Sequence, residues 1–432
     1  MKFIIYGAGK RGKETLQVIG ADNVVAFADS DNTKCGTEYC NLTVMRVDEL
    51  QMFLDVAICI VTPVNGRMKI VEELKRIGIK NSIPLKAFDS VLRYGKDFIF
   101  NSIFSQYGGH NIAIYGLSAG SIMLYQYLTG RMQKQVFLVY DEKEEVINNL
   151  YAWGIKPFGI CDVCQNVDIV INTELALPAE VKSKVPENVR IIEIQELLET
   201  NLAFCNKRIE DFKDIHNNQR CFIVATGPSL AIRDLETLRE HGVKCISMNR
   251  IYNLFAQTMW RPDYYMIEDT MMIEDLRKEI AEMNLPVKFV SSVPEEYWKQ
   301  KDVGNSIRYQ LINLDMTGQE LPLFSEKIEK CIYEGSTVTY ACIQLAVYMG
   351  FNEIYLLGVD FNYSQDLYDE KNHFTGYQKD KKVRLNTVYP ERMQAAYERA
   401  KQYAEMHGIQ IFNATRGGKL EVFERVNFNE LF

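Results

Sequence analysis

Residues 221–230 read CFIVATGPSL, an apolar run that breaks at Gly-Pro-Ser and is followed by a helical pattern over 231–240. A strand that ends in a glycine turn and opens a helix brings backbone N–H groups and the positive end of the helix dipole to one point, which suits a phosphate. Gly227 permits the tight turn, Pro228 fits a first helical turn, and Ser229 can cap it. An ordinary strand-to-helix turn of an α/β domain is the alternative, and these residues alone leave both interpretations open.

Composition limits the classes of protein to consider. At 432 residues the chain is long enough for about three domains. A net charge of −8 argues against a protein that coats nucleic acid or anionic membrane. No apolar stretch reaches the roughly 18 residues that span a bilayer, and the apolar segment at the start is too short for a signal peptide. We therefore expect a cytoplasmic protein with no integral membrane segment and no nucleic-acid partner.

The ten cysteines are scattered and several lie in apolar runs, so we expect them to be reduced. Only Cys161 and Cys164 have the spacing of a metal or redox pair. They lack a second such pair and a nearby histidine, so no metal site is predicted.

The first hundred residues have the pattern of a Rossmann-like domain, expected over 1–105. A short apolar strand over 2–6 leads into GAGKRG, and a second strand over 24–28 ends on an acidic residue. This is the fingerprint of a dinucleotide or nucleotide-sugar site, in which glycines allow a close approach and the acid accepts a ribose hydroxyl. A purely structural Rossmann turn is the alternative. The candidate residues are Gly7, Gly9, Gly12 and Asp29.

The segment 109–204 repeats this pattern. NIAIYG at 111–116 aligns in sequence with KFIIYG at 2–7, with an offset of 109 positions, and the later predicted strands align as well. Two tandem Rossmann-like units follow. The second unit has lost the middle glycine of its turn, since Leu117, Ser118 and Ala119 stand there. We expect it to be a packing partner and not a second cofactor site.

A polar stretch over 205–219 is predicted to be a linker to a third unit, 220–432, which again alternates strands and helices. Its strands end on polar residues. In an open parallel sheet, ligands bind at the carboxyl ends of the strands, so these side chains should converge. They are Asn249, Glu268 or Asp269, and Asp360.

The third unit resembles a known family. ATGPSL at 225–230, SMN at 247–249, Ser336-Thr337, EIYLLGVDF at 353–361 and NHFTGY at 372–377 resemble the former domain of unknown function 115. That group is now called 6-hydroxymethylpterin diphosphokinase MptE-like. It is similar to the Maf flagellin glycosyltransferases and to the family 42 sialyltransferases.

The resemblance spans about 220–420. Residues 1–105 resemble the N-terminal domains of acetyltransferases that act on nucleotide-linked sugars. The fold class expected is α/β: two tandem Rossmann-like parallel-sheet domains followed by a larger Rossmann-like, sialyltransferase-like catalytic domain.

The resemblance also implies site residues. In the sialyltransferases the Gly-Pro-Ser turn and the asparagine that ends the next strand hold the CMP part of the donor, and a tyrosine hydrogen-bonds the leaving phosphate. Tyr368 has the matching spacing, and Asn362 replaces the second tyrosine. Arg416, in a closing glycine turn, is a candidate phosphate or carboxylate partner. The nucleotide-binding residues expected are Thr226, Gly227, Pro228, Ser229, Asn249, Asp269 and Arg416.

The general base departs from the sialyltransferase pattern, because Tyr377 stands where those enzymes have a histidine. A tyrosine with a pKa near 10 is a poor base at neutral pH. Either His373, four residues earlier, has the role, or the reaction differs. From the residues alone, His373 is a base, a metal ligand or a solvated side chain. The catalytic candidates are therefore His373, Tyr377, Asp360 and Tyr368.

Three functions remain open. The first is a glycosyltransferase of surface glycan, polysaccharide or glycoprotein biosynthesis, whose donor is a CMP-linked nonulosonic acid and whose acceptor is a glycan or protein. The second is a diphosphokinase that requires Mg²⁺, held by Glu268, Asp269 and Asp360. The third is a non-catalytic nucleotide-sugar-binding protein, supported by Tyr377. No cofactor besides the donor nucleotide is required in the first, and a homo-oligomer is compatible with all three.

Overall fold

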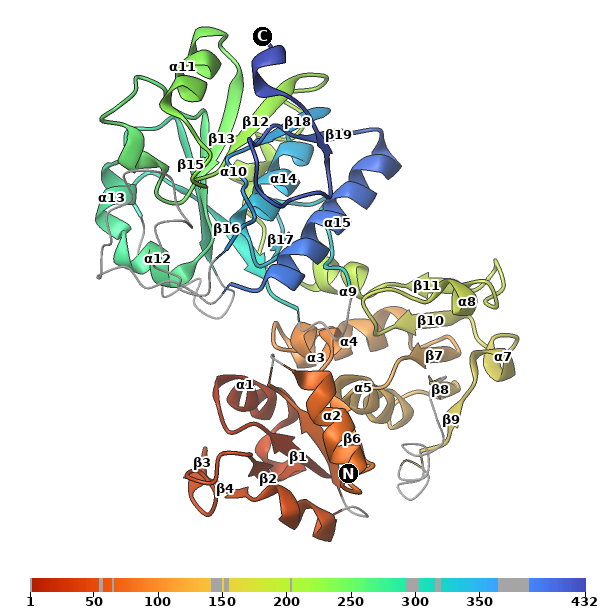
Figure 1. Cartoon of the computed structure of the whole chain (residues 1–432). Coiled ribbons are helices and arrows are strands. Elements are labelled where there is room, and N and C mark those ends of the chain that lie inside the picture. Colours follow the sequence, from red (N-terminus) through yellow and green to blue (C-terminus); the bar gives the residue numbers. More distant parts are fainter. Residues whose placement is uncertain are drawn as a thin grey trace. The chain divides into compact units, whose positions relative to one another are not determined.

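The computed structural model describes residues 2–53, 57–63, 66–140, 150, 155–202, 204–292, 303–314, 320–363 and 388–432. The chain forms two compact units (Figure 1). The amino-terminal unit comprises Met1–Leu202 with Leu314–Glu320, and the carboxyl-terminal unit comprises Ala203–Asn313 with Leu321–Phe432.

The amino-terminal unit begins with a sheet in the order β3-β4-β2-β1-β5-β6, parallel except for the β3–β4 hairpin. Its central strands are continuous apolar runs because helices cover both faces of such a sheet. The strands are β1 Lys2–Tyr6, β2 Val24–Ala28, β3 Glu38–Tyr39, β4 Leu42–Met45, β5 Ala57–Val61 and β6 Ser82–Pro84. The helical segments are α1 Lys10–Ile19, η1 Ala21–Asn23, η2 Val47–Phe53 and α2 Arg67–Arg76.

Helices α3 (Ala87–Leu92) and α4 (Lys96–Tyr107) lead into a second, parallel sheet with the order β11-β10-β7-β8-β9. Its strands are β7 Ile112–Tyr115, β8 Val136–Val139, β9 Pro157–Phe158, β10 Ile169–Asn172 and β11 Arg190–Ile192. The helices here are α5 Ala119–Thr129, α7 Ile160–Val163, α8 Ala179–Lys182 and α9 Ile194–Asn201.

The two sheets repeat the same local construction. The Thr62 hydroxyl donates to the carbonyl of Tyr6 at 2.8 Å, and the Thr173 hydroxyl donates to the carbonyl of Tyr115 at 2.7 Å. The glycine after each tyrosine has a positive φ, 107° at Gly7 and 111° at Gly116. In both sheets the first strand pairs with the strand that this threonine directly follows. The predicted α/β fold class and tandem repeat are therefore confirmed.

In the described part of the carboxyl-terminal unit, one parallel sheet has nine strands in the order β17-β16-β15-β14-β13-β12-β18-β19-β20. They are β12 Arg220–Val224, β13 Lys244–Met248, β14 Tyr264–Ile267, β15 Val287–Ser292, β16 Ile307–Ile312, β17 Ile332–Tyr333, β18 Glu353–Leu357, β19 Gln410–Asn413 and β20 Glu424–Arg425. The helical segments are α10 Lys207–Glu210, α11 Ile232–Glu240, η3 Ile251–Leu254, α12 Thr270–Asp275, α13 Arg277–Glu282, α14 Val338–Tyr348, α15 Pro390–His407 and η5 Phe428–Glu430.

Alternate residues of β12 belong to different cores. Cys221 and Ile223 pack with residues of α14 and α15, whereas Phe222 and Val224 pack with residues of α11, α12 and α13. The period of two along a strand thus distributes one apolar run between two helical layers. Both faces of β12 are therefore covered by helices.

The stretch over 205–219, which the sequence predicts to be a linker, packs against the carboxyl-terminal unit. Ile209 is completely buried in its core, and Asn206 donates from its backbone to the carbonyl of Glu329 at 2.8 Å. The His216 ring stacks on Phe351 and lies 2.7 Å from the Tyr264 hydroxyl. In this polar stretch Ile209 and His216 are buried, whereas Ile215 is exposed. The second unit begins at Ala203, earlier than the polarity suggests.

Candidate functional site

The order of the nine strands reverses direction between β12 and β18. From β12 the chain adds β13 to β17 on one side, and then adds β18, β19 and β20 on the other. Val224 lies opposite both Ser247 of β13 and Leu357 of β18, so the segments that follow these strands start at one level. The loops diverge at such a reversal, and the crevice between them is the usual ligand site of an open α/β sheet.

A cleft of about 600 Å³, including its open mouth, lies at this reversal. It is lined by residues 225–228 after β12, Met248 and Asn249 at the end of β13, residues 337–339 at the start of α14, and residues 358–363 after β18. Sequence reasoning predicted the convergence of Asn249 and Asp360 with the turn over 226–228, and the cleft brings all of them together.

The Gly-Pro-Ser segment forms a turn that precedes the helix. The helix α11 begins only at Ile232, and its N-cap is Ala231. Ser229 therefore does not cap the helix, and its hydroxyl instead donates to Oδ2 of Asp360 at 2.9 Å. A Cβ atom on Gly227 would lie 2.0 Å from the same oxygen and 2.4 Å from the carbonyl oxygen of Gly358. Close approach of two loops, more than a tight turn, explains the glycine.

Asp360 is fixed from both sides of its loop. Its carbonyl accepts from Lys419 N–H at 2.7 Å, and a Cβ on Gly418 would lie 2.5 Å from that carbonyl oxygen. Burial raises the pKa of the Asp360 carboxyl, and the hydrogen bonds from Ser229 offset this only in part. The carboxylate is thus held in place at the cleft at an electrostatic cost.

Three residues at the cleft have strained backbones. Asn249 has a φ of 51° and Phe361 also has a φ of 51°, and both line the cleft. Ser336, with a φ of 58°, precedes the lining residue Thr337. Such conformations cost about 1–3 kcal/mol each for residues other than glycine, and they persist where the surroundings enforce them. For Asn249, the Tyr265 hydroxyl helps by donating to its carbonyl at 2.7 Å.

The amino end of α14 forms another wall of the cleft. Thr337 is its N-cap, in an extended conformation, and its hydroxyl accepts from Thr339 N–H at 3.3 Å. Most of this helix is buried, so its dipole is poorly screened. Sequence reasoning used Ser336-Thr337 only for the family resemblance. A Ser-Thr pair before a long apolar helix is a capping signal that could have placed this end at the site.

Comparison with known proteins gives one family match. Residues 196–366 match the family described as 6-hydroxymethylpterin diphosphokinase MptE-like. These residues are similar to that family. The resemblance predicted from the motifs is confirmed, and the match includes the strands β12 to β18 that build the cleft. No curated protein matches the chain.

Several solved structures are similar to the chain at low identity. One is a Maf glycosyltransferase from Magnetospirillum magneticum AMB-1, with 15% identity over 85% of this chain and 67% of that one and a TM-score of 0.34. Another is the dipicolinate synthase A chain from Bacillus subtilis, with 14% identity over 46% and 85% and a TM-score of 0.21. Shikimate 5-dehydrogenase from Thermus thermophilus, solved with NADP(H) and shikimate, has 10% identity over 46% and 89% and a TM-score of 0.20. Scores this low transfer no function to the chain.

Four predicted polar residues of the carboxyl-terminal unit lie outside the set that lines the cleft: Ser229, which contacts Asp360, and Glu268, Asp269 and Arg416. Asp269 caps α12, and its Oδ1 accepts from the N–H groups of Met271 and Met272. Arg416 forms a bidentate pair with Asp234, at 2.5 and 2.7 Å. Glu268 has a buried Oε2 without a described hydrogen-bond partner, and burial holds its pKa well above the ordinary value.

Other predicted residues lie outside the described part of the chain. These are Tyr368, His373 and Tyr377, which fall within 364–387. Within the described ranges no three His, Cys, Asp or Glu side chains gather as a metal site. Likewise, none of the helices searched there has the length and apolar character of a membrane span.

The amino-terminal glycine motif joins a strand to a helix, as expected of a Rossmann turn. The carboxylate of its acidic residue, Asp29, already accepts hydrogen bonds from the protein itself. Asp29 Oδ2 accepts from Ala8 N–H and from Lys34, each at 2.9 Å. Burial alone would raise the pKa of Asp29, but hydrogen bonds from Asp31 N–H, Lys34 and Ala8 N–H lower it below the ordinary value. Gly12 has its backbone packed against Gly7, whereas a Cβ on Gly9 would meet nothing within 4 Å.

In the second repeat a carboxylate of the chain itself occupies the position that a phosphate would take. Asp89 of α3 accepts from Gly120 N–H in the first turn of α5 at 2.6 Å, and it is buried. Sequence reasoning missed this residue. The contact gives a physical reason for expecting a packing partner here and not a cofactor site.

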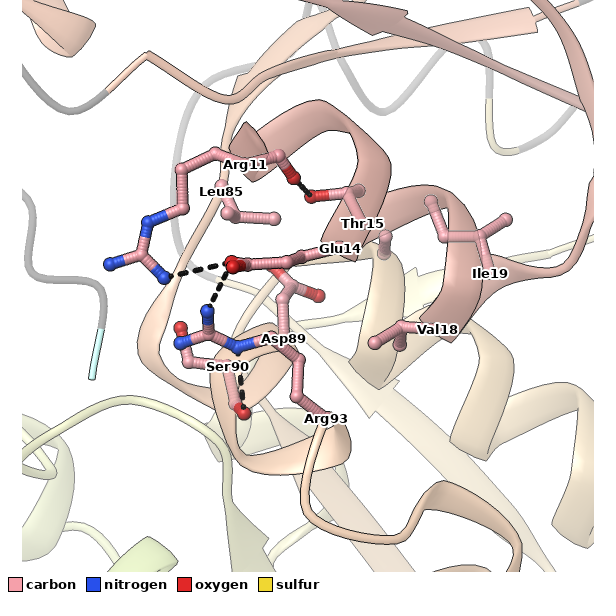
Figure 2. Close-up of a pocket in the computed structure, with 10 residues that line it drawn as sticks. Arg11, Glu14, Thr15, Val18, Ile19, Leu85, Asp89, Ser90 and Arg93 are labelled. Atoms are coloured by element: carbon pink, nitrogen blue, oxygen red, sulfur yellow. Dashed lines mark hydrogen bonds and ion pairs between the residues drawn. The ribbon is translucent and has the colours of Figure 1, made fainter. Parts of the chain in front are cut away.

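The pocket beside Asp89 lies among α1, α3 and the start of α5 (Figure 2). Figure 2 shows the guanidinium groups of Arg11 and Arg93 directed at Glu14, at 3.2 and 2.7 Å. Its other walls are largely apolar. The Arg11–Glu14 pair lies within α1, and the Arg93–Glu14 pair joins α1 to the residue that follows α3. Ala119 of α5 also lines the pocket, so the pocket is part of the packing of these three helices.

Proposed function

We propose that the chain is a glycosyltransferase that binds a nucleotide-activated sugar in the cleft between β12 and β18. The donor proposed is a CMP-linked nonulosonic acid, and the acceptor is a surface glycan or a glycoprotein. The observation that carries the proposal is the cleft itself, which lies at the strand reversal of an MptE-like region and is built on strained residues. Strain of this kind is retained where it positions a ligand.

In the proposed reaction, an acceptor hydroxyl oxygen attacks the anomeric carbon of the donor. The bond between that carbon and the phosphate oxygen breaks, and CMP leaves with the electron pair. The acceptor proton passes to a base, for which His373 is the candidate, and Tyr368 is the candidate to hydrogen-bond the departing phosphate. The pairing of Arg416 with Asp234 removes Arg416 from our proposal for that charge.

The diphosphokinase alternative takes its support from the description of the matched family. It needs Mg²⁺ held by carboxylates at the cleft. Of the three candidate acids, Asp360 alone lines the cleft, while Asp269 caps a helix. This separation of the acids favours sugar transfer over diphosphate transfer.

A thermal-shift panel on the full chain tests the proposal. The ligands are CMP, CDP, UDP, NAD, and ATP with and without Mg²⁺, because a ligand that binds the native state raises its apparent stability. The variants are Asn249→Ala and, as a matched control, Asn284→Ala in an exposed loop. We expect stabilisation by CMP that Asn249→Ala abolishes and Asn284→Ala retains.

Other outcomes of the panel separate the alternatives. Stabilisation by ATP only with Mg²⁺ would replace the transferase by the diphosphokinase. CMP binding without release of CMP from any CMP-sugar in the presence of acceptor glycans would indicate the non-catalytic binding protein. Selective stabilisation by NAD would move the ligand site to the amino-terminal glycine motif.

A further inference from the structure

The turn over 227–230 has already used its hydrogen-bond donors. The N–H of Gly227 donates to Gly358 O at 2.9 Å, and the N–H of Leu230 donates to Gly227 O at 3.2 Å. The N–H and hydroxyl of Ser229 both donate to Asp360 Oδ2, at 3.3 and 2.9 Å. Pro228 has no N–H. The carboxylate of Asp360 therefore occupies the position at this turn that a bound phosphate would take.

The charge at this wall also opposes a phosphate. Asp360 is the only charged residue among the described residues that line the cleft. Two negative groups in a partly buried site repel each other strongly. A carboxylate instead accepts hydrogen bonds from hydroxyl or amino groups, which a nucleoside provides on its ribose and its base.

Elsewhere in the cleft lining, two donors have no described acceptor. Val338 is the first residue of α14, and within the described chain no group accepts from its N–H. Asn249 also lines the cleft, and its side-chain amide has no described hydrogen-bond partner. Asn249 is held there by a strained φ of 51°. An anion at this wall would meet both donors and the positive end of a buried helix.

We propose that the nucleotide lies across the cleft in one direction, with hydroxyl or amino groups of its nucleoside on Asp360 and its phosphate on Val338 N–H and the Asn249 amide. This inference rests on the proposed function. It reverses the orientation expected from the sequence, which placed the phosphate at the Gly-Pro-Ser turn.

A single backbone substitution tests the phosphate side. Proline is favoured at the first position of a helix, and the preceding Thr337 has a φ of −154° and a ψ of 130°, which a following proline accepts. Val338→Pro thus removes one N–H and keeps the helix. Thr270→Pro is the matched control, because Thr270 is the first residue of α12 and follows the extended Asp269.

The measurement is the dissociation constant of CMP and of cytidine, by calorimetry on the full chain. We expect Val338→Pro to weaken CMP binding about tenfold, the loss of one hydrogen bond to a charged group, with cytidine unchanged. Thr270→Pro should change neither. Asp360→Asn should weaken CMP and cytidine by the same factor, because it acts on the part that both ligands share.

The outcomes separate this proposal from the proposed function. If the wild-type chain binds CMP and Val338→Pro leaves that affinity unchanged, or weakens cytidine equally, the orientation is wrong while the nucleotide site stands. If Asp360→Asn weakens CMP but not cytidine, the phosphate lies at the turn after all. If the wild-type chain binds neither ligand, the proposed function fails and the orientation with it. Melting temperatures of the variants show whether each has folded, and the Asp360→Asn arm does not depend on Val338→Pro.

Discussion

The helices α5 and α14 begin beside the strand reversals of two similar parallel sheets, but their amino ends have different neighbours. At α5, the carboxylate of Asp89 accepts from Gly120 N–H at 2.6 Å, and the site is closed by the chain itself. At α14, Val338 and Thr339 line an open cleft of about 600 Å³. The amino end of one helix is thus closed by packing within the chain, while that of the other lines an open cleft.

The difference teaches that topology selects where a ligand can bind, while a few side chains decide whether it does. The anion position is filled by Asp89 in the second repeat and by Asp360 at the Gly-Pro-Ser turn. Among the described residues, Val338 N–H at the start of α14 has no such acceptor. Side chains that approach from distant segments, and not the glycine motifs, make this distinction.

The largest effect is expected from Gly227→Ala. The new Cβ would lie 2.0 Å from Asp360 Oδ2 and 2.4 Å from Gly358 O, so the loops after β12 and β18 must separate. We expect a loss of about 3 kcal/mol in the free energy of unfolding, and loss of CMP binding. The measurements are denaturant unfolding and calorimetry.

Gly9→Ala in the amino-terminal motif is the control for that experiment, since its Cβ would meet nothing within 4 Å. It should change the unfolding free energy little. An equally large loss at Gly9, or none at Gly227, would contradict the close contact between the loops after β12 and β18.

Removal of the internal anion at α5 should have the next largest effect. Asp89→Ala leaves Gly120 N–H and Lys86 N–H without their acceptor in a buried position. We expect a cost of about 2 kcal/mol by denaturant unfolding. Asp162→Ala, which removes the exposed cap of α7, should cost distinctly less. Equal losses of unfolding free energy would mean that Asp89 stabilises the protein no more than an exposed helix cap does.

Asn249→Gly should separate stability from binding. Glycine adopts the φ of 51° without strain, so the variant should gain about 1 kcal/mol of stability. Because the amide is lost, CMP affinity should fall. A variant that is less stable than the wild type, or that binds CMP normally, would show that the strain at Asn249 does not serve the cleft.

His216, which contacts the first residue of β14 at the amino ends of the strands, should make the stability of the protein depend on pH. Burial lowers the pKa of His216, and its contact with Gln219 offsets this only in part. In the unfolded chain the imidazole takes up a proton near pH 6.5, before the folded chain does. Stability should therefore decline as pH falls below about 6.5 through the folded pKa. His216→Asn should flatten the difference in melting temperature between pH 7.5 and 5.5; an unchanged difference would exclude His216 as its cause.

Much of the fold could be predicted because apolar runs and glycine turns are local features. The repeat was visible in the paired Tyr-Gly turns at 6–7 and 115–116, and the strand ends at Asn249 and Asp360 indicated the ligand edge. The contacts that fill or open each site were not visible. Asp360 meets Ser229 across 131 positions, and Arg416 meets Asp234 across 182, and no spacing along the chain encodes such pairs.

Hydrogen exchange of the full chain with and without CMP tests the central claim most directly, because it reports on both kinds of site at once. We predict slower exchange in peptides that cover 225–230, 248–250, 337–340 and 358–363, with no change over 7–13 and 29–34. Slower exchange over 7–13 and 29–34, with none at the cleft, would contradict the account and place the nucleotide in the amino-terminal unit.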